Sequence, residues 1–135
     1  MFKTNIDEIP ESGISRSYRD GISIRYLILE EFGAPNFEMR YFELDRGALS
    51  AQDHHESEHE VFVVRGRGKL HLKDRTVELK PKDAIFIDSW EHHQFEQVGE
   101  EPFGFLCIVP NGVSKSKREV SLDYGEHFSE SPSPV

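Results

Sequence analysis

Short runs in which apolar and polar residues alternate occupy most of the chain between residues 20 and 111. They are rich in β-branched and aromatic residues, and a period of two is typical of strands with one buried face. The runs cover residues 22–28, 37–44, 60–65, 69–73, 76–79, 84–87, 94–97 and 103–109. Glycine- and proline-containing turns separate them, and no central stretch predicts a helix. We therefore expect an all-β sandwich or barrel.

The two ends of the chain differ from this central part. Residues 1–20 are polar, contain Pro10 and Gly13, and predict an irregular N-terminal arm. Residues 112–135 are poor in apolar side chains and predict a polar C-terminal tail that is partly disordered. One β-barrel domain over residues 21–111 is the expected organisation. A chain of 135 residues buries enough surface to fold without a disulfide or a zinc staple.

Two of the predicted strands are apolar on both faces, at residues 61–64 and 84–87. An outer face that is also covered, by a second subunit or by the N-terminal arm, would produce this pattern. We therefore expect a homodimer. Phe42, Phe86 and Phe95 are interpreted as core residues.

The charge and cysteine content narrow the expected partners. A net charge of −9 argues against nucleic acid and anionic membranes, which require a basic face. No apolar run approaches the ~20 residues of a membrane span, and the N-terminus lacks the apolar stretch of a signal peptide. Cys107 is the single cysteine, so the chain cannot form an internal disulfide. The expected location is a reducing cytoplasm.

Six of the seven histidines fall in one window, from His54 to His93. In an extended segment Asp53 and His55 point to the same side and His54 to the other. His59, after a short loop, and His93, from a neighbouring strand, could then meet that pair. Three imidazoles and one carboxylate that converge inside a barrel are typical of a transition-metal site.

The same window leaves other ligand sets open. His54 is an alternative to Asp53, and a shifted register would make Glu60 the carboxylate ligand. His71 and His92 are expected at the surface. The interpretation without a metal is a polar barrel rim that carries solvated imidazoles.

The window resembles the first sequence motif of the cupin superfamily. That motif runs Gly, five residues, His-x-His, three or four residues, Glu or His, six residues, Gly. Positions 47, 53, 55, 59 and 66 have this spacing. The stretch from 58 to 68 looks closest to small single-domain cupins whose metal is held by four histidines.

The second cupin motif has a Pro-x-Gly-Asp turn, then a strand, then a histidine. Residues 81–83, the predicted strand 84–87 and His93 fit it. Residues 33–40 and 105–110 also look like segments of small cupins, so the resemblance covers about residues 20–111.

Four positions depart from the family pattern. Asp53 replaces the first motif histidine and Ser57 replaces a tryptophan. Lys82 stands at the glycine of the second motif, and Asp88 at the proline that usually ends its strand. The change at Asp53 bears directly on the metal, because a carboxylate is also a ligand but is shorter than a histidine.

The resemblance implies a single-domain cupin β-barrel, also called a double-stranded β-helix or jelly roll. It implies one divalent transition metal ion per chain, Mn, Fe, Ni, Cu or Zn, on Asp53, His55, His59 and His93. It also implies that Arg40, Phe105 and Cys107 line the cavity near the metal. The alternatives without a role in the site are that Arg40 is a surface cation and that Cys107 is a small core residue. An Arg40 side chain in the cavity could hold an anionic substrate.

Several functions are compatible with such a site. The favoured one is a metal-dependent enzyme acting on a small organic molecule, with dioxygenase-like oxidation first and decarboxylation or isomerisation next. The alternative from another class is a non-catalytic cupin that binds a metal or a small ligand, as a sensor or storage module. A third is a degenerate cupin in which Asp53 has abolished metal binding. The cupin fold itself does not choose between reactions.

Overall fold

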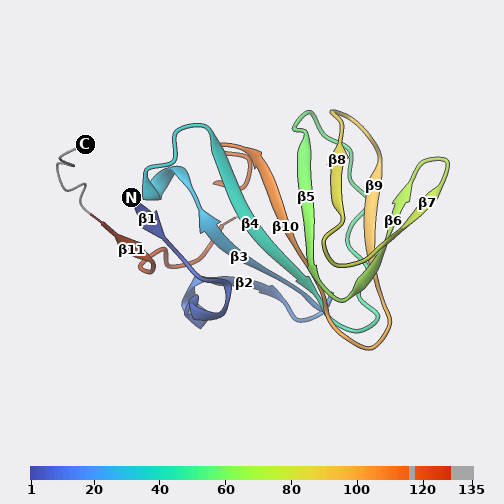
Figure 1. Ribbon diagram of the computed structural model, residues 1–135, viewed down its shortest axis with the longest axis horizontal. Helices are drawn as coiled ribbons and strands as arrows, with labels where there is room; N and C mark the ends of the chain where they lie inside the picture. Colours follow the sequence, from blue (N-terminus) through green and yellow to red (C-terminus); the bar gives the residue numbers. More distant parts are fainter. Residues whose placement is uncertain (116–117, 129–135) are drawn as a thin grey trace.

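The computed structural model describes residues 1–115 and 118–128, and its regular structure is almost entirely β (Figure 1). The strands are β1 (Phe2–Lys3), β2 (Ile14–Ser17), β3 (Ile22–Ile28), β4 (Phe37–Leu44), β5 (His59–Arg65), β6 (Arg67–Leu72), β7 (Thr76–Leu79), β8 (Ala84–Ile87), β9 (His93–Val98), β10 (Phe103–Pro110) and β11 (Glu126–His127). Three short 3-10 helices cover Ile6–Glu8, Glu11–Gly13 and Glu30–Phe32. Among these residues no helix is long and apolar enough to cross a membrane.

Two antiparallel sheets form the body of the molecule. The larger sheet has the strand order β2-β3-β4-β10-β5-β8, and the smaller has the order β7-β6-β9. One apolar core joins them, since buried side chains from both sheets pack in a single cluster. Its members include Val61, Val63, Leu70, Phe95, Phe103, Phe105 and Cys107. This closed arrangement is the β-barrel that the alternating sequence pattern predicts. A third pair, β1 and β11, joins the two ends of the described chain.

The segment that precedes β5 extends the smaller sheet although it is not a strand. Leu49 and Asp53 form isolated bridges with Glu96 and His93 of β9. The Ser50 side chain adds a further bond, because its Oγ accepts the Phe95 amide at 2.8 Å. The loop between β4 and β5 is therefore fastened along β9, which brings its histidines to the barrel.

Gly66 makes the tight turn between β5 and β6. Its φ of +69° lies in the left-handed region, and a Cβ there would overlap the carbonyl oxygen of Pro102. Both facts explain a glycine at this position, since only glycine adopts such a φ without strain.

All eight strands predicted from the sequence are present, four of them with the predicted bounds. Part of the N-terminal arm is regular, because β2 pairs with β3 at one edge of the larger sheet. The tail prediction falls partly on residues 116–117 and 129–135, which lie outside the described residues. The described part of the tail includes β11.

Phe86 is not a core residue as predicted. Its side chain is 58% exposed on the outer face of β8, whereas Phe95 is buried. Phe62 and Val64 are also exposed, on the outer face of the neighbouring β5. The N-terminal arm does not cover this surface, since β2 lies at the opposite edge of the sheet from β8. The sequence predicts that either the N-terminal arm or a second subunit covers this face, and the second subunit is the explanation that remains.

The homodimer stays a prediction, and Phe86→Glu tests it. A charge in the middle of an apolar contact is costly to bury, so we expect the wild type to sediment as a dimer and Phe86→Glu as a monomer. The matched control is Tyr18→Glu, which changes an aromatic side chain that is 86% exposed and lies just after β2. A monomeric wild type, or a dimer that survives Phe86→Glu and dissociates with Tyr18→Glu, would contradict the prediction.

The C-terminal segment is tied to β4 by a buried ionic cluster. Glu38, on β4, is 1% exposed and accepts hydrogen bonds from the Ser114 amide at 2.9 Å and the Ser114 hydroxyl at 3.1 Å. Arg118 Nη1 lies 3.6 Å from Glu38 Oε2, and Arg118 also pairs with Glu31. These contacts hold residues 113–115 against the barrel, where Val113 forms part of the cavity wall.

Candidate metal centre

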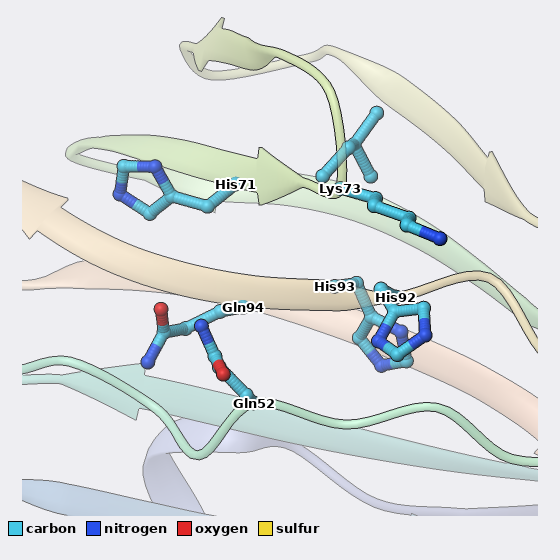
Figure 2. Close-up of a pocket in the computed structure, with 7 residues that line it drawn as sticks. Gln52, His71, Lys73, His92, His93 and Gln94 are labelled. Carbon is cyan, nitrogen blue, oxygen red and sulfur yellow. The ribbon is translucent and has the colours of Figure 1, made fainter.

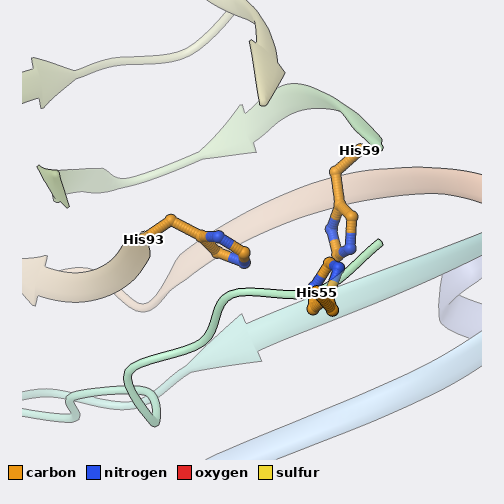
Figure 3. A group of neighbouring side chains, drawn as sticks. All are labelled: His55, His59 and His93. Atoms are coloured by element: carbon orange, nitrogen blue, oxygen red, sulfur yellow. The ribbon is translucent and has the colours of Figure 1, made fainter. Parts of the chain in front are cut away.

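Three histidines converge at one end of the barrel (Figure 3). His59 and His93 are the first residues of β5 and β9, and His55 lies in the loop before β5. The ring centroid of His55 lies 4.4 Å from the ring centroid of His59 and 5.1 Å from that of His93. Each ring offers a ligand atom within 4.8 Å of the other two. A single ion could contact all three after small rotations of the rings.

Backbone pairing explains why these residues meet. Asp53 and His93 exchange two amide-to-carbonyl hydrogen bonds of 2.9 Å each, and the Trp90 amide donates to the His55 carbonyl at 2.7 Å. His59 is paired with Ile87 at the end of β8. The loop and the two strand starts are thus aligned by hydrogen bonds that need no metal.

Hydrogen bonds also orient two of the rings. His55 Nδ1 lies 2.9 Å from the Ser57 carbonyl, and His93 Nδ1 lies 2.8 Å from the Glu91 carbonyl. A carbonyl only accepts, so Nδ1 carries the proton in both rings. In the neutral imidazole with this tautomer, the lone pair is on Nε2, and that nitrogen can bind a metal. These carbonyl partners could not be predicted from the sequence, because any residue can supply a backbone carbonyl.

The third ring, that of His59, contacts a side chain instead of a backbone carbonyl. His59 Nδ1 lies 3.1 Å from Cys107 Sγ, on β10. Arg40 Nη2, on β4, donates to the same sulfur at 3.4 Å. Burial raises the pKa of the Cys107 thiol, although the neighbouring guanidinium acts in the opposite direction. Cys107 is therefore a neutral, buried contact of His59, which agrees with its interpretation as a small core residue.

The histidines open on a cavity of about 480 Å³ inside the barrel. Arg40, Phe105 and Cys107 all line it, where the sequence resemblance expects them. The wall is otherwise mainly apolar, and its remaining members are Ile22, Ile24, Phe42, Leu44, Ser50, Ala51, Asp53, Ser57, Phe95 and Val113. Phe105 stacks on Phe42 at 5.4 Å and on Phe95 at 4.5 Å. Val113 was not predicted as a lining residue, because it follows the last predicted strand.

The structure does not bring Asp53 into the group of ligand atoms. Its side chain is exposed and lines the cavity, and among the described residues only the three histidines bring their ligand atoms within 4.8 Å of one another. His54 is outside the group as well, because its ring stacks on His92 at 4.4 Å. Glu60 is exposed on β5 and is also outside the group. None of the three residues considered for the fourth position lies with the three histidines.

Asp53 as a fourth ligand stays a prediction from sequence, and Asp53→Asn tests it against the geometry. From the structure we expect the dissociation constant of the ion to change by less than the ~10-fold that loss of a ligand or of its partner costs. Asparagine keeps the size and the backbone bonds to His93 and removes only the charge. Competition titration against a chelating dye measures the effect. A loss of 10-fold or more would show that the carboxylate moves onto the ion.

A second hollow, of about 260 Å³, shares His93 with the main cavity (Figure 2). Its other lining residues are Gln52, His71, Leu72, Lys73, His92 and Gln94. His71 uses both ring nitrogens in hydrogen bonds, to Thr76 Oγ1 at 2.9 Å and Glu96 Oε1 at 2.7 Å. His71 and His92 therefore stand apart from the three-histidine group, as the sequence analysis expects.

Comparison with known proteins connects this geometry to a family. Residues 40–109 match the cupin domain family, a stretch that contains all three histidines. Over 72 residues the chain is 36% identical to the 1-methylthio-D-xylulose 5-phosphate methylsulfurylase of Rhodospirillum rubrum, which is 53% of this chain and 46% of that protein. The chain spans about half the length of the curated relatives it matches.

Two solved structures extend the likeness beyond the central motifs. A cupin 2 domain-containing protein from Halorhodospira halophila is 35% identical, with a TM-score of 0.64 over 82% of this chain and 76% of that one. The polyketide cyclase RemF from Streptomyces resistomycificus is 27% identical, with a TM-score of 0.70 over 99% of this chain and 89% of that one.

Proposed function

Because this chain belongs to the cupin superfamily, we propose that it is a metal-dependent enzyme that acts on a small organic molecule inside the barrel. The observation that carries the proposal is the group of three histidines whose ligand atoms lie within 4.8 Å of one another. These atoms border a cavity of about 480 Å³, which is a size typical of small-molecule sites.

The donor set fits one divalent transition metal ion. Imidazole nitrogen suits Mn, Fe, Ni, Cu and Zn, and two of the rings are already oriented by their Nδ1 hydrogen bonds to carbonyls. Such an ion, when bound, supplies Lewis acidity and coordination positions that the protein leaves open. His55, His59 and His93 are the residues that would hold it.

We favour dioxygenase-like oxidation as the reaction. In an oxidative cleavage of this kind both oxygen atoms of O₂ enter the organic product and the substrate supplies all four electrons, so the reaction needs no external reductant. The chain contributes apolar wall surface near the histidines, where Phe105 stacks on both Phe42 and Phe95. Besides the histidines, the polar side chains of the wall are Arg40, Ser50, Asp53 and Ser57, and Asp53 is the one carboxylate that lines the cavity among the described residues.

A metal-assisted reaction without O₂ is the second candidate. It is favoured by the likeness to the polyketide cyclase, which covers nearly the whole chain. In such a reaction a protein group must take or give a proton, and Asp53 is exposed on the cavity wall where a substrate could reach it. Decarboxylation and isomerisation belong to the same class.

Turnover assays with and without O₂ separate these functions. Protein reconstituted with Fe(II), Mn(II) or Zn(II) is incubated with small molecules that carry adjacent oxygen donors, such as catechols, β-diketones and 2-hydroxy acids. We expect O₂ uptake matched by product with one of the redox-active ions, and none with His93→Ala. Product formed equally under argon would support the second candidate. Tight binding without turnover under any condition would overturn the enzyme proposal in favour of a binding module.

A further inference from the structure

Arg40 is a buried charge with no carboxylate partner in the part of the chain that the structure describes. Its side chain lines the main cavity and the residue is 7% exposed. Its guanidinium donates to Cys107 Sγ at 3.4 Å and lies 4.9 Å from the centre of the Phe42 ring. Among the described residues no carboxylate lies within ion-pair distance of Arg40, and its buried Nε has no hydrogen-bond partner. A thiol and an aromatic face are weak substitutes for an anion.

Arg118 is an arginine with a similarly buried side chain, and it shows the contrast. Arg118, with a side chain 5% exposed, pairs with both Glu31 and Glu38. Burial of a charge is expensive unless an opposite charge or several hydrogen bonds compensate it. At Arg118 the protein supplies the anions itself, whereas at Arg40 the cavity is the place from which an anion can come.

We propose that Arg40 binds the carboxylate of the substrate, so that the natural substrate is a small organic acid with an apolar body. The inference rests on the proposed function and specifies its substrate class. A single sulfur atom, Cys107 Sγ, separates the guanidinium from the His59 ring, which puts the acid group beside the histidines. The apolar body would then pack against Phe42 and Phe105.

The charge inventory of the cavity favours a carboxylate over a phosphate. Arg40 is the one arginine or lysine among the lining residues that the structure describes, and Asp53 adds a negative charge to the same wall. One guanidinium matches one carboxylate in charge and in its planar geometry. A phosphate dianion would leave its second charge to the ion proposed at His55, His59 and His93, whereas a carboxylate is matched by Arg40 alone.

Matched acids and amides test the proposal by calorimetry. The probes are benzoate, phenylacetate, salicylate and 3-phenyl-2-oxopropanoate, each with its neutral primary amide, and phenyl phosphate as the dianion. We expect at least one acid to bind the wild type more tightly than its amide. Arg40→Gln should weaken that acid by about 10-fold or more and leave the amide unchanged. Arg40→Lys should retain part of the preference, because it keeps the charge and loses the planar fork.

Three further readouts make the result decisive. Arg40→Gln should melt at the same or a higher temperature than the wild type, since it removes an uncompensated buried charge; a structural role would lower the melting temperature. Arg25→Gln, which changes a half-buried arginine paired with Glu43, should leave acid binding unchanged. The metal content of Arg40→Gln should equal that of the wild type.

The outcomes separate this proposal from the metal-dependent function. The inference is overturned if no acid exceeds its amide, if Arg40→Gln binds acids like the wild type, or if phenyl phosphate binds more tightly than every carboxylate. Acid binding that is lost on EDTA treatment but survives Arg40→Gln would assign the carboxylate to the ion alone. Acid binding that depends on Arg40 in a protein that takes up no metal would instead overturn the proposed function and keep the inference.

Discussion

Replacement of His93 with alanine is expected to abolish metal binding. Wild-type protein dialysed against Mn(II), Fe(II) or Zn(II) should retain about one ion per chain, and His93→Ala less than about a tenth of that. The reason is that His93 supplies one of three ligand atoms in the group, so its loss leaves the ion only two imidazoles. The affinity should fall by at least the ~100-fold that marks the upper range for changes to outer-shell partners. Elemental analysis after dialysis gives the stoichiometry.

His92→Ala is the matched control for this experiment. It removes the same side chain one residue earlier, where the ring stacks on His54 and lies outside the three-histidine group. We expect its metal content to equal that of the wild type. Equal losses in His92→Ala and His93→Ala would mean that the ions bind histidines without regard to the barrel, and would contradict the assignment.

Arg118→Ala is expected to destabilise the protein by about 3–5 kcal/mol, the usual cost of removing one partner of a buried ion pair. Glu38 is 1% exposed, so its carboxylate would lose a cation that solvent cannot replace. The Arg118 guanidinium also covers the Tyr26 ring at 5.7 Å. Equilibrium unfolding in urea, followed by circular dichroism, measures the change in free energy.

Lys115→Ala provides the control in the same segment. Its ammonium pairs with Glu30 at 2.8 Å, but the side chain is 63% exposed, and surface ion pairs contribute little. We expect a midpoint close to that of the wild type. The double variant Glu38→Leu, Arg118→Met should recover much of the loss, because apolar residues of similar size can replace a buried pair. A loss below about 1 kcal/mol in Arg118→Ala would show that the pair opens to water.

The barrel was predictable because apolar and polar residues alternate along its strands, and this pattern is visible in short stretches of sequence. Which face of β8 is buried was not predictable, since residues 84–87 are apolar throughout and show no alternation. Phe86 is the side chain that lies on the exposed face. Strand β2 was missed because it is short and polar and depends on pairing with β3. The Glu38–Arg118 pair joins residues 80 positions apart, and no local sequence pattern predicts such a contact.

The three histidines were predictable from spacing, because His59 and His93 begin strands that the pattern defines. The expected position of Asp53 depended on an extended segment that continues through His55. In the structure only residue 53 forms a bridge in that segment, and the chain bends at residues 56 and 57 before β5. Alternation nevertheless holds as predicted, because Asp53 and His55 line the cavity and His54 does not, but Asp53 does not join the group of ligand atoms.

The most direct test of the metal centre is an anomalous difference map from crystals of protein reconstituted with Mn(II), Fe(II) or Zn(II), measured on both sides of the absorption edge of the added metal. We expect one strong peak per chain, ~2.0–2.3 Å from a nitrogen atom of each of His55, His59 and His93. No peak within reach of these three rings, or a peak on His54 and His92 instead, would contradict the account.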